Sequence, residues 1–258
     1  MTHPHPKLFL LVNKLNAHKK IIYDRLVAAL GDMVSIDFYI YNNDYNYFKK
    51  LIQTNQHDYT HYVIIPHFNE GSEKAHEVIN QFIPVEKLIV VDKPIPHIKG
   101  KYGAICQDFS ADIYNALEQA LEPLTKYRKI KIIFPRDTHH PKEILEGLSR
   151  FCHRYAFDSE IVQDITKENI QAGEVTISIT ENDLIVLVEK ILATSLKVGK
   201  EVGIISYNET PLKKIILEGI TTISADFQFM GQKTAQMILE NSKEHIVVPF
   251  ALTLRASL

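Results

Sequence analysis

Short apolar runs that alternate with helix-length amphipathic stretches constrain the fold of this chain more than any other feature. The alternation begins at residue 8 and continues to residue 121, and it starts again at residue 129. Strands that alternate with long helices predict βαβ units and mainly parallel sheets. Two such runs, each about as long as a small domain, predict an α/β protein with two doubly wound parallel-sheet lobes, which meet near Pro123–Tyr127.

Strands are predicted from β-rich apolar runs, and helices from apolar residues that recur every three or four positions. The predicted strands are Leu8–Val12, Val34–Ile40, Tyr62–Ile65, Lys87–Val91, Gly103–Cys106, Lys129–Phe134, Ser159–Val162, Val175–Ile179 and Val202–Ser206. The predicted helices are Lys19–Leu30, a helix carrying Phe48–Ile52 after a cap at Asn43 or Asp44, Ser72–Gln81, Ala111–Leu121, Pro141–Tyr155, Leu184–Leu196 and Lys233–Leu239.

The composition excludes several classes of protein. Of the 258 residues, 45% are hydrophobic and 23% are charged, which is typical of an ordinary globular protein. A net charge of −2 and the lack of a Lys/Arg-rich run argue against a general nucleic-acid-binding surface. Two cysteines, Cys106 and Cys152, are too few for a disulfide framework and fit a reducing compartment, with both expected to be small buried side chains.

The amino end leads from Met1 to Pro6 directly into the first strand. It lacks the basic region, apolar region and small-residue cleavage site of a signal peptide. No stretch reaches the roughly 18 apolar residues of a membrane span. We therefore expect a cytoplasmic chain that does not contact a membrane.

Known enzyme and metal motifs are missing. The first strand runs into Asn13–Ala17 without a glycine turn, so the sequence gives no support for dinucleotide binding. It contains no phosphate-binding P-loop, no nucleophile elbow and no HExxH. His139 and His140 are the most metal-like pair, but adjacent residues do not share a helix face, and exposed or ligand-facing imidazoles are the simpler interpretation. We expect no cofactor, no metal and no enzymatic activity.

Four short segments occur in an order typical of one family. SYNETPL at 206–212 and ITTISADFQFMGQ at 220–232 follow TENDL at 180–184 and precede LTLRAS at 252–257. These segments resemble the effector-binding domain of LacI/GalR transcription regulators, in which "ANDxxA", "GYDD…PLTTI…DF…GQ" and "LxxRxS" are typical. In some regulators of the GntR type a winged-helix head is joined to the same sensor fold.

The resemblance implies a periplasmic-binding-protein type I-like fold whose chain crosses between lobes more than once. It assigns 1–125 plus 224–246 to a first lobe and 126–223 plus 247–258 to a second. A sugar or sugar-like metabolite is expected between strand ends of both lobes. The implied function is an effector-sensing domain of a bacterial transcription regulator, with DNA bound only through a head domain that this chain does not carry. The alternative is a solute-binding protein of a sugar transporter, and an enzyme of similar architecture is disfavoured.

The resemblance also selects ligand-binding residues. In the first lobe Asn16 and His18 fall where the family has its "NPFF" loop, although ordinary polar residues at a helix start are an equal interpretation. Asp92 and Lys93 fall where the family has an acidic–Arg pair, which could equally be a structural ion pair. The complete set of expected ligand contacts is Asn16, His18, His67, Asp92, Lys93, Asp112, Arg136, Asp137, His140, Asn182, Asn208 and Phe227.

Two departures from the family concern ligand choice. Ile144 stands at the position of the usual sugar-gripping arginine, so Arg136, His140 or Lys142 would have to replace its charge. Phe227 is either a ligand-packing ring or a core residue, and Tyr207 is interpreted as a hinge or core aromatic. An anionic ligand would use the cationic and titratable groups His18, Lys19, Arg136, His139, His140 and Lys142, whereas a neutral sugar, which we favour, would use imidazoles only as hydrogen-bond partners.

A sensor that repositions two DNA-binding heads must form a symmetric homodimer. The apolar residues around Phe48–Leu51 and in Lys74–Phe82 could form its interface, as first-lobe helices do in the family. The alternative is that these residues only cover their own sheet.

Overall fold

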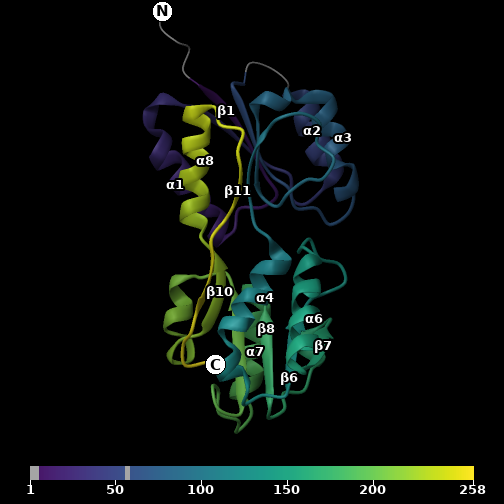
Figure 1. Cartoon of the computed structure of the whole chain (residues 1–258), viewed down its shortest axis with the longest axis vertical. Coiled ribbons are helices and arrows are strands. Elements are labelled where there is room, and N and C mark those ends of the chain that lie inside the picture. The colour runs from purple at the N-terminus through teal and green to yellow at the C-terminus, as the bar shows by residue number, and fades with distance from the viewer. Residues whose placement is uncertain (1–5, 56–58) are drawn as a thin grey trace, which may run out of the picture. The chain divides into compact units, whose positions relative to one another are not determined.

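The structure, a computed structural model, describes residues 6–55 and 59–258. The first five residues of the amino end, in which no signal peptide is predicted, lie outside the described residues. The chain divides into two compact units (Figure 1). Unit 1 consists of Met1–Gln107 and Asp226–Pro249, and unit 2 consists of Asp108–Ala225 and Phe250–Leu258. Each has the doubly wound α/β architecture predicted from the sequence.

Unit 1 is built on a six-stranded parallel sheet of order β11-β5-β4-β3-β1-β2. Helices α1 and α8 pack together on one side, and α2 and α3 lie together on the other (Figure 1). The elements are β1 (Lys7–Val12), α1 (Ala17–Leu30), β2 (Ser35–Ile40), α2 (Tyr45–Thr54), β3 (His61–Ile65), α3 (Ala75–Phe82), β4 (Leu88–Asp92), β5 (Gly103–Cys106), α8 (Phe227–Glu240) and β11 (His245–Val247).

Unit 2 is built on a six-stranded sheet of order β12-β10-β9-β8-β6-β7, in which only β12 is antiparallel to its neighbour. The elements are α4 (Phe109–Gln119), α5 (Leu121–Leu124), β6 (Lys129–Ile133), α6 (Glu143–Tyr155), β7 (Asp158–Val162), β8 (Glu174–Ser178), α7 (Glu181–Leu192), β9 (Val202–Tyr207), the 3-10 turns η5 (Pro211–Lys214) and η6 (Ile216–Glu218), β10 (Thr221–Ala225) and β12 (Phe250–Thr253).

The strands are continuous apolar runs because helices cover both faces of each sheet. Residues 8–12 of β1 and all of β4 are buried, for example. Two helix pairs approach so closely that only glycine fits between them. A Cβ on Gly231 of α8 would lie 2.4 Å from the Ile22 carbonyl oxygen of α1, and one on Gly147 of α6 would lie 2.2 Å from the Ser110 carbonyl oxygen of α4.

Helix α4 belongs to unit 2, so the first change of unit lies at residues 107–108, earlier than the boundary near residue 125 expected from the sequence. The reason is the tight packing of α4 against α6, which a count of alternating elements does not reveal. Helix α8 begins at Phe227, six residues before the predicted start at Lys233, because Asp226 caps it by accepting a hydrogen bond from the Phe229 N–H at 2.9 Å.

Three short strands near the carboxyl end, β10, β11 and β12, were not predicted individually. No helix within residues 6–55 and 59–258 has the length and apolar character needed to cross a membrane.

Candidate functional site

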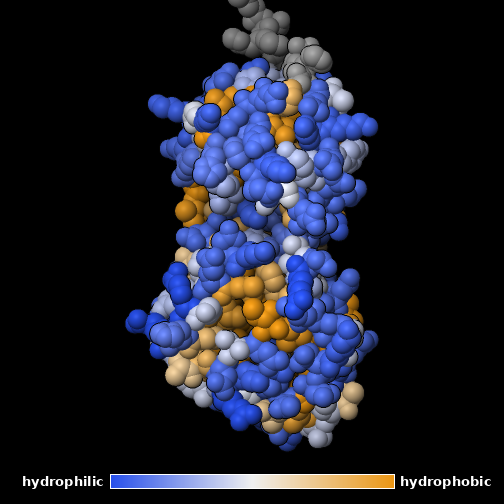
Figure 2. Space-filling model, turned by 90° about the vertical axis from the view of Figure 1, so that its right-hand side faces the viewer, coloured by the Kyte–Doolittle hydropathy of each residue, from blue (hydrophilic) through white to orange (hydrophobic). Residues whose placement is uncertain are grey.

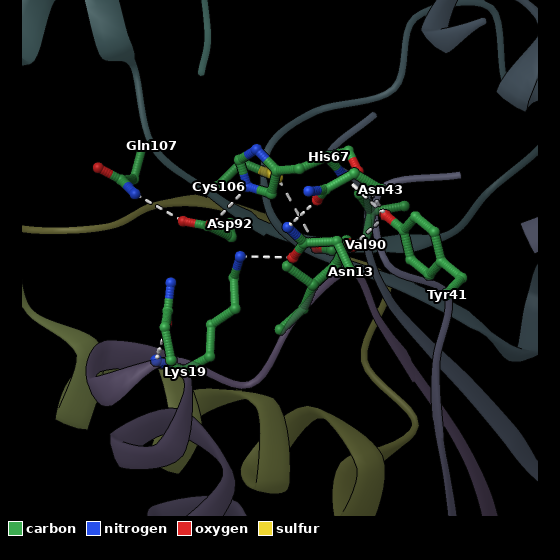
Figure 3. A network of polar contacts seen from close by, with 11 residues as sticks. Asn13, Lys19, Tyr41, Asn43, His67, Val90, Asp92, Cys106 and Gln107 are labelled. Carbon is green, nitrogen blue, oxygen red and sulfur yellow. Dashed lines mark hydrogen bonds and ion pairs between the residues drawn. The ribbon is translucent and has the colours of Figure 1, made fainter. Parts of the chain in front are cut away.

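Polar side chains gather at the carboxyl ends of the parallel strands of unit 1 (Figure 3). Each of the strands β1 to β5 is followed by, or ends on, one of them. We call this set the strand-end cluster; it consists of Asn13, Lys19, Asn43, His67, Asp92 and Gln107. All but Gln107 are at most 5% exposed. Ligands of open α/β sheets bind at this edge, so the cluster marks the candidate site of unit 1.

Asp92, the last residue of β4, is the acceptor at the centre of the cluster. Its Oδ2 lies 2.6 Å from Nε2 of His67, and its Oδ1 accepts a hydrogen bond from Nε2 of Gln107 at 2.5 Å. Asp92 has a positive φ of 76°, an uncommon conformation for this residue type. Backbone strain at a buried carboxylate is typical of a site whose geometry the surrounding structure enforces.

Lys19 reaches into the cluster from the first turn of α1. Its ammonium group donates a hydrogen bond to Oδ1 of Asn13, and Nδ2 of Asn13 donates to Oδ1 of Asn43 at 2.6 Å. Asn16 caps the helix, because its side chain accepts a hydrogen bond from the Lys19 N–H at 3.1 Å. This cap fixes the position of the Lys19 backbone in the first turn. A chain of amides therefore joins the ends of β1 and β2 to a buried cation.

Opposite charges balance each other in the cluster. Burial lowers the pKa of Lys19 to about 8, although the charge of Asp92 opposes this. Burial would raise the pKa of Asp92, but the hydrogen bond with His67 and the charge of Lys19 hold it below its ordinary value. Burial and the Lys19 charge lower the pKa of His67 despite its bond to Asp92, so a neutral imidazole donates to a carboxylate.

The hydroxyl group of Tyr41 fixes the backbone beside His67. It donates to the carbonyl oxygen of Ile65 at 2.8 Å and accepts from the His67 N–H at 2.8 Å. Tyr41 itself is fully buried against Phe48 and Phe68. The position of His67 is therefore held by the aromatic core of unit 1.

The other residues expected in this unit lie around the cluster. The His18 ring packs on the ring of Phe227, with centroids 4.8 Å apart, and the charge of His18 contributes to the low pKa of Asp92. Phe227 is 5% exposed, so the ring is mostly a core residue, one of the two interpretations left open by the sequence. Lys93 is half-buried beside Asp92.

In unit 2 the two expected asparagines stand at strand ends in different environments. Asn208 directly follows β9 with φ of 64°, is half-buried, and donates its N–H to the Ile223 carbonyl oxygen at 2.9 Å. The buried ammonium group of Lys213 fixes this turn by donating to the carbonyl oxygens of Tyr207 and Asn208 at 2.8 and 2.6 Å. Asn182 is exposed in the first turn of α7, where Thr180 is the cap and Asp183 bonds to it.

The remaining residues expected in unit 2 are less concentrated. Arg136 and Asp137 are exposed in the loop after β6, and the rings of His139 and His140 stack with centroids 4.4 Å apart. Ile144, at the position of the family arginine, is 2% exposed in the core. The six groups considered for an anionic ligand divide between the units, since His18 and Lys19 belong to unit 1 and the other four to unit 2.

Asp112 differs from the other expected ligand contacts of unit 2. It lies in α4, is 9% exposed, and its Oδ2 has no hydrogen-bond partner among the described residues. Burial, with a contribution from the negative charge of Asp108, raises the pKa of Asp112 to about 7.

The motif at the carboxyl end is structural. Arg255 makes two hydrogen bonds to the carboxylate of Glu209, Nη1 to Oε2 at 3.0 Å and Nη2 to Oε1 at 2.9 Å. The Ser257 hydroxyl donates to the Ile204 carbonyl oxygen and accepts from the Thr221 N–H, both at 2.7 Å. These residues fix the carboxyl-terminal segment to β9 and β10. The motif therefore supports the fold and does not bear on the choice of ligand.

The strand-end cluster can bind polar groups, but it holds no activated nucleophile. Cys106, the nearest thiol, contacts the Val90 carbonyl oxygen, and burial raises its pKa, which disfavours the reactive thiolate. In the described part of the chain, no group of three or more His, Cys, Asp or Glu residues is arranged to hold a metal ion.

The sequence predicted His67 and Asp92 as residues of the site. It did not predict Asn13, Asn43 or Gln107. The available signal was position, because each is among the first polar residues after a predicted strand. What the sequence could not show is that these amides contact one another or Asp92.

Known proteins resemble this chain in their solved structures. No family model matches the sequence, and no curated protein matches it. The Lac repressor bound to ONPG in its repressed state superposes with a TM-score of 0.81 at 14% identity, covering 100% of this chain and 83% of that one. A transcription regulator like protein from Staphylococcus haemolyticus gives 0.75 at 13%, with 98% of both chains covered.

A third structure shows a bound sugar. A LacI family transcriptional regulator from Lactobacillus casei with bound glucose gives a TM-score of 0.74 at 12% identity, covering 98% of this chain and 100% of that one. At such identities the likeness establishes the fold, the periplasmic-binding-protein type I-like fold that LacI-type regulators share.

Proposed function

We propose that this chain is the effector-sensing domain of a bacterial transcription regulator and binds a neutral sugar or sugar-like metabolite. The observation that carries the proposal is the strand-end cluster, a buried set of amide, carboxylate and imidazole groups, in a fold shared with regulators such as one that holds glucose. Such groups provide the dense, directional hydrogen bonds that recognise hydroxyls.

The charge balance of the cluster favours a neutral ligand over an anionic one. Lys19 is 3% exposed, and its ammonium group is engaged by Asn13 and faces the anionic Asp92. An anion would have to compete with Asp92 for this charge and lose its own hydration. Hydroxyl groups, which both donate and accept, complement the amides without that cost.

Binding would be coupled to DNA through a head domain of LacI or GntR type, and the ligand would act by shifting a conformational equilibrium. The role proposed is binding rather than catalysis. No observation favours a transport-type solute-binding protein, since the named structural neighbours are regulators.

A thermal-shift screen against monosaccharides, sugar phosphates and uronic acids tests the proposal. A ligand at a hundredfold over its Kd should stabilise the chain by about 2.7 kcal/mol. Asn182 and Asn208 are proposed ligand contacts of unit 2, so Asn182→Ala and Asn208→Ala should each weaken binding by about 1–3 kcal/mol. Asn46→Ala, at an exposed position of α2, is the control and should bind like wild type. Wild-type affinity in both asparagine variants would remove these two residues from the site.

We further propose a homodimer that uses an apolar groove of unit 2. A cavity of about 180 Å³ lies between α7 and the turns η5 and η6, lined mainly by Leu184, Ile185, Val188, Leu212 and Ile216. Leu212 and the neighbouring Ile215 project from the same surface, 63% and 74% exposed. Apolar projections beside an apolar groove suit a two-fold contact, in which each copy supplies both.

The first-lobe helices are less suited to this role. Phe48 and Leu51 are 0% and 8% exposed and pack in the core of unit 1, so they cover their own sheet, the alternative left open by the sequence. In the view of Figure 2, hydrophobic residues also gather on unit 2, bounded by hydrophilic ones. Light scattering at micromolar concentration should give a dimer for wild type and a monomer for Ile215→Glu. Ile161→Glu, at another exposed apolar position, is the control; a wild-type monomer would contradict the proposal.

A further inference from the structure

Two buried oxygen atoms of unit 2 stand out: Oδ2 of Asp112 and the phenol oxygen of Tyr207 have no hydrogen-bond partner among the described residues. Asp112 is 9% exposed and Tyr207 is 5% exposed. Folding withdraws both atoms from water without replacing the hydrogen bonds they had there, and native structures rarely keep such atoms without a reason.

Both residues lie in the same region of unit 2, around β12. The negative charge of Asp112 is, after burial, the cause that raises the pKa of Tyr207. Helix α4, which carries Asp112, packs against β12, and the Phe250 ring of β12 lies 6.1 Å from the Tyr207 ring. The two oxygens are not hydrogen-bonded to each other or to another described residue, so the hydrogen-bonding capacity of both is unused.

Both residues also lie at the edge of the sheet where ligands bind. Tyr207 is the last residue of β9. The carboxyl end of α4 leads through α5 to the start of β6, so the amino end of α4, with Asp112, is at the carboxyl edge of the parallel strands. Asn208, a proposed ligand contact, directly follows Tyr207.

The chemistry of the pair selects a neutral partner. The carboxyl group of Asp112 is largely protonated at pH values below about 7, so it donates as well as accepts, and a phenol does both. The charged group that acts on Asp112 is the carboxylate of Asp108, and Arg150 on the adjacent α6 contacts Ser110 instead. An incoming anion would meet negative charge, whereas a hydroxyl group would satisfy both oxygens.

We propose that Asp112 and Tyr207 form a hydroxyl-binding subsite of unit 2, in which one hydroxyl group of the bound sugar or polyol hydrogen-bonds to both side chains. The subsite rests on the proposed sugar-sensing function and adds a specificity determinant to it. A ligand that lacks this hydroxyl, or carries a carboxylate there, is rejected.

The chain offers a matched control in Tyr127. Its phenol oxygen is also buried in unit 2 without a hydrogen-bond partner, but it packs against Gly203 near the start of β9, at the opposite edge of the sheet. Tyr127→Phe and Tyr207→Phe each remove one buried oxygen and keep the ring. Only the second should affect a ligand at the carboxyl edge.

The experiment measures sugar affinity by calorimetry in wild type, Tyr207→Phe, Asp112→Leu and Tyr127→Phe. The probes are glucose, galactose, ribose, sucrose and myo-inositol, together with the deoxy analogues of whichever binds. We expect Tyr207→Phe and Asp112→Leu to bind about tenfold or more weakly, and Tyr127→Phe to match wild type. One deoxy analogue should lose about tenfold on wild type and clearly less on Tyr207→Phe, in which only Asp112 remains to bind that hydroxyl.

The outcomes separate the subsite from the function on which it rests. If a probe binds wild type and all three variants equally, the subsite is refuted and the sugar-sensing function stands. If no probe binds wild type, the proposed function fails and the subsite falls with it. Should Asp112→Leu not fold, Tyr207→Phe and the deoxy analogues decide the question, since the phenylalanine keeps the packing against Phe250.

Discussion

Asp92 and Asp112 are buried carboxyl groups at corresponding edges of the two units, yet their protonation differs. Asp92, 3% exposed, has hydrogen bonds with His67 and Gln107 and lies near Lys19, and its pKa is lowered. Asp112, 9% exposed, has an oxygen without a partner and a carboxylate neighbour, and its pKa is raised to about 7. Both side chains are buried, and burial by itself would raise the pKa of each. The hydrogen-bond partners and the nearby charges therefore set the direction of the pKa shift of each carboxyl group, which burial alone does not predict.

The strongest test of this comparison removes Asp92. Asp92→Ala leaves Lys19 buried without its counter-charge and leaves His67 and Gln107 without their acceptor. Removing one partner of a buried charge pair typically costs about 3–5 kcal/mol, so urea unfolding at pH 7 should show a loss of this size. Asp24→Ala, which breaks only the exposed Lys20–Asp24 pair of α1, should change stability by less than about 0.5 kcal/mol. Equal small losses would show that the cluster contributes little.

The second test concerns pH. Because the native pKa of Asp112 is raised above its unfolded value, the native state holds the extra proton between about pH 4 and 7. The contribution of Asp112 to stability is thus fully present below about pH 4 and is lost as pH rises through 7. Relative to wild type, Asp112→Asn should be more stabilising at pH 8 than at pH 4, by roughly 4 kcal/mol. Unfolding midpoints across this range measure it, and a difference that does not depend on pH would contradict the raised pKa.

The smallest effect is expected at a carboxylate that is exposed. Asp226 acts only as the cap of α8, through the Phe229 N–H, so Asp226→Ala should cost about 1 kcal/mol. Asp226→Asn, which can still accept that hydrogen bond, should cost less. Sugar affinity, measured on the same two proteins, should remain that of wild type. A loss of affinity would show that the aspartate of this motif contacts ligand and would extend the comparison to a third carboxylate.

The fold could be predicted because periodicity and helix caps are local properties of the sequence. The strand of residues 8–12 and the cap at Asp44 both occur where the pattern indicated. The assignment of α4 could not be predicted, because it depends on the contact between Ser110 and Gly147, which lie 37 positions apart in the chain.

The site was predicted less completely. His67 and Asp92 follow strands that the pattern identified, so their meeting follows from parallel order. The contact between the amides of Asn13 and Asn43 depends on side-chain directions in the turns after two strands, which residue type alone does not fix, and Asn43 itself has a positive φ of 59°. Tyr207 was expected to be a hinge or core residue, and its burial agrees with the core interpretation, but its unpaired oxygen becomes visible only beside Asp112.

Unit 1 is built from two separate segments of the chain, so the ribosome completes it late in synthesis. The first 107 residues emerge without α8 and β11, so α1 has no helix to pack against its Ile22–Arg25 surface until residues 227–240 have been synthesised. At usual rates of synthesis this wait lasts roughly ten seconds, longer than most domains need to fold. Unit 2, nearly contiguous in sequence, can meanwhile assemble most of its sheet. The nascent chain should therefore expose the apolar side of β4 and β5, on which α8 packs, to chaperones during its own elongation.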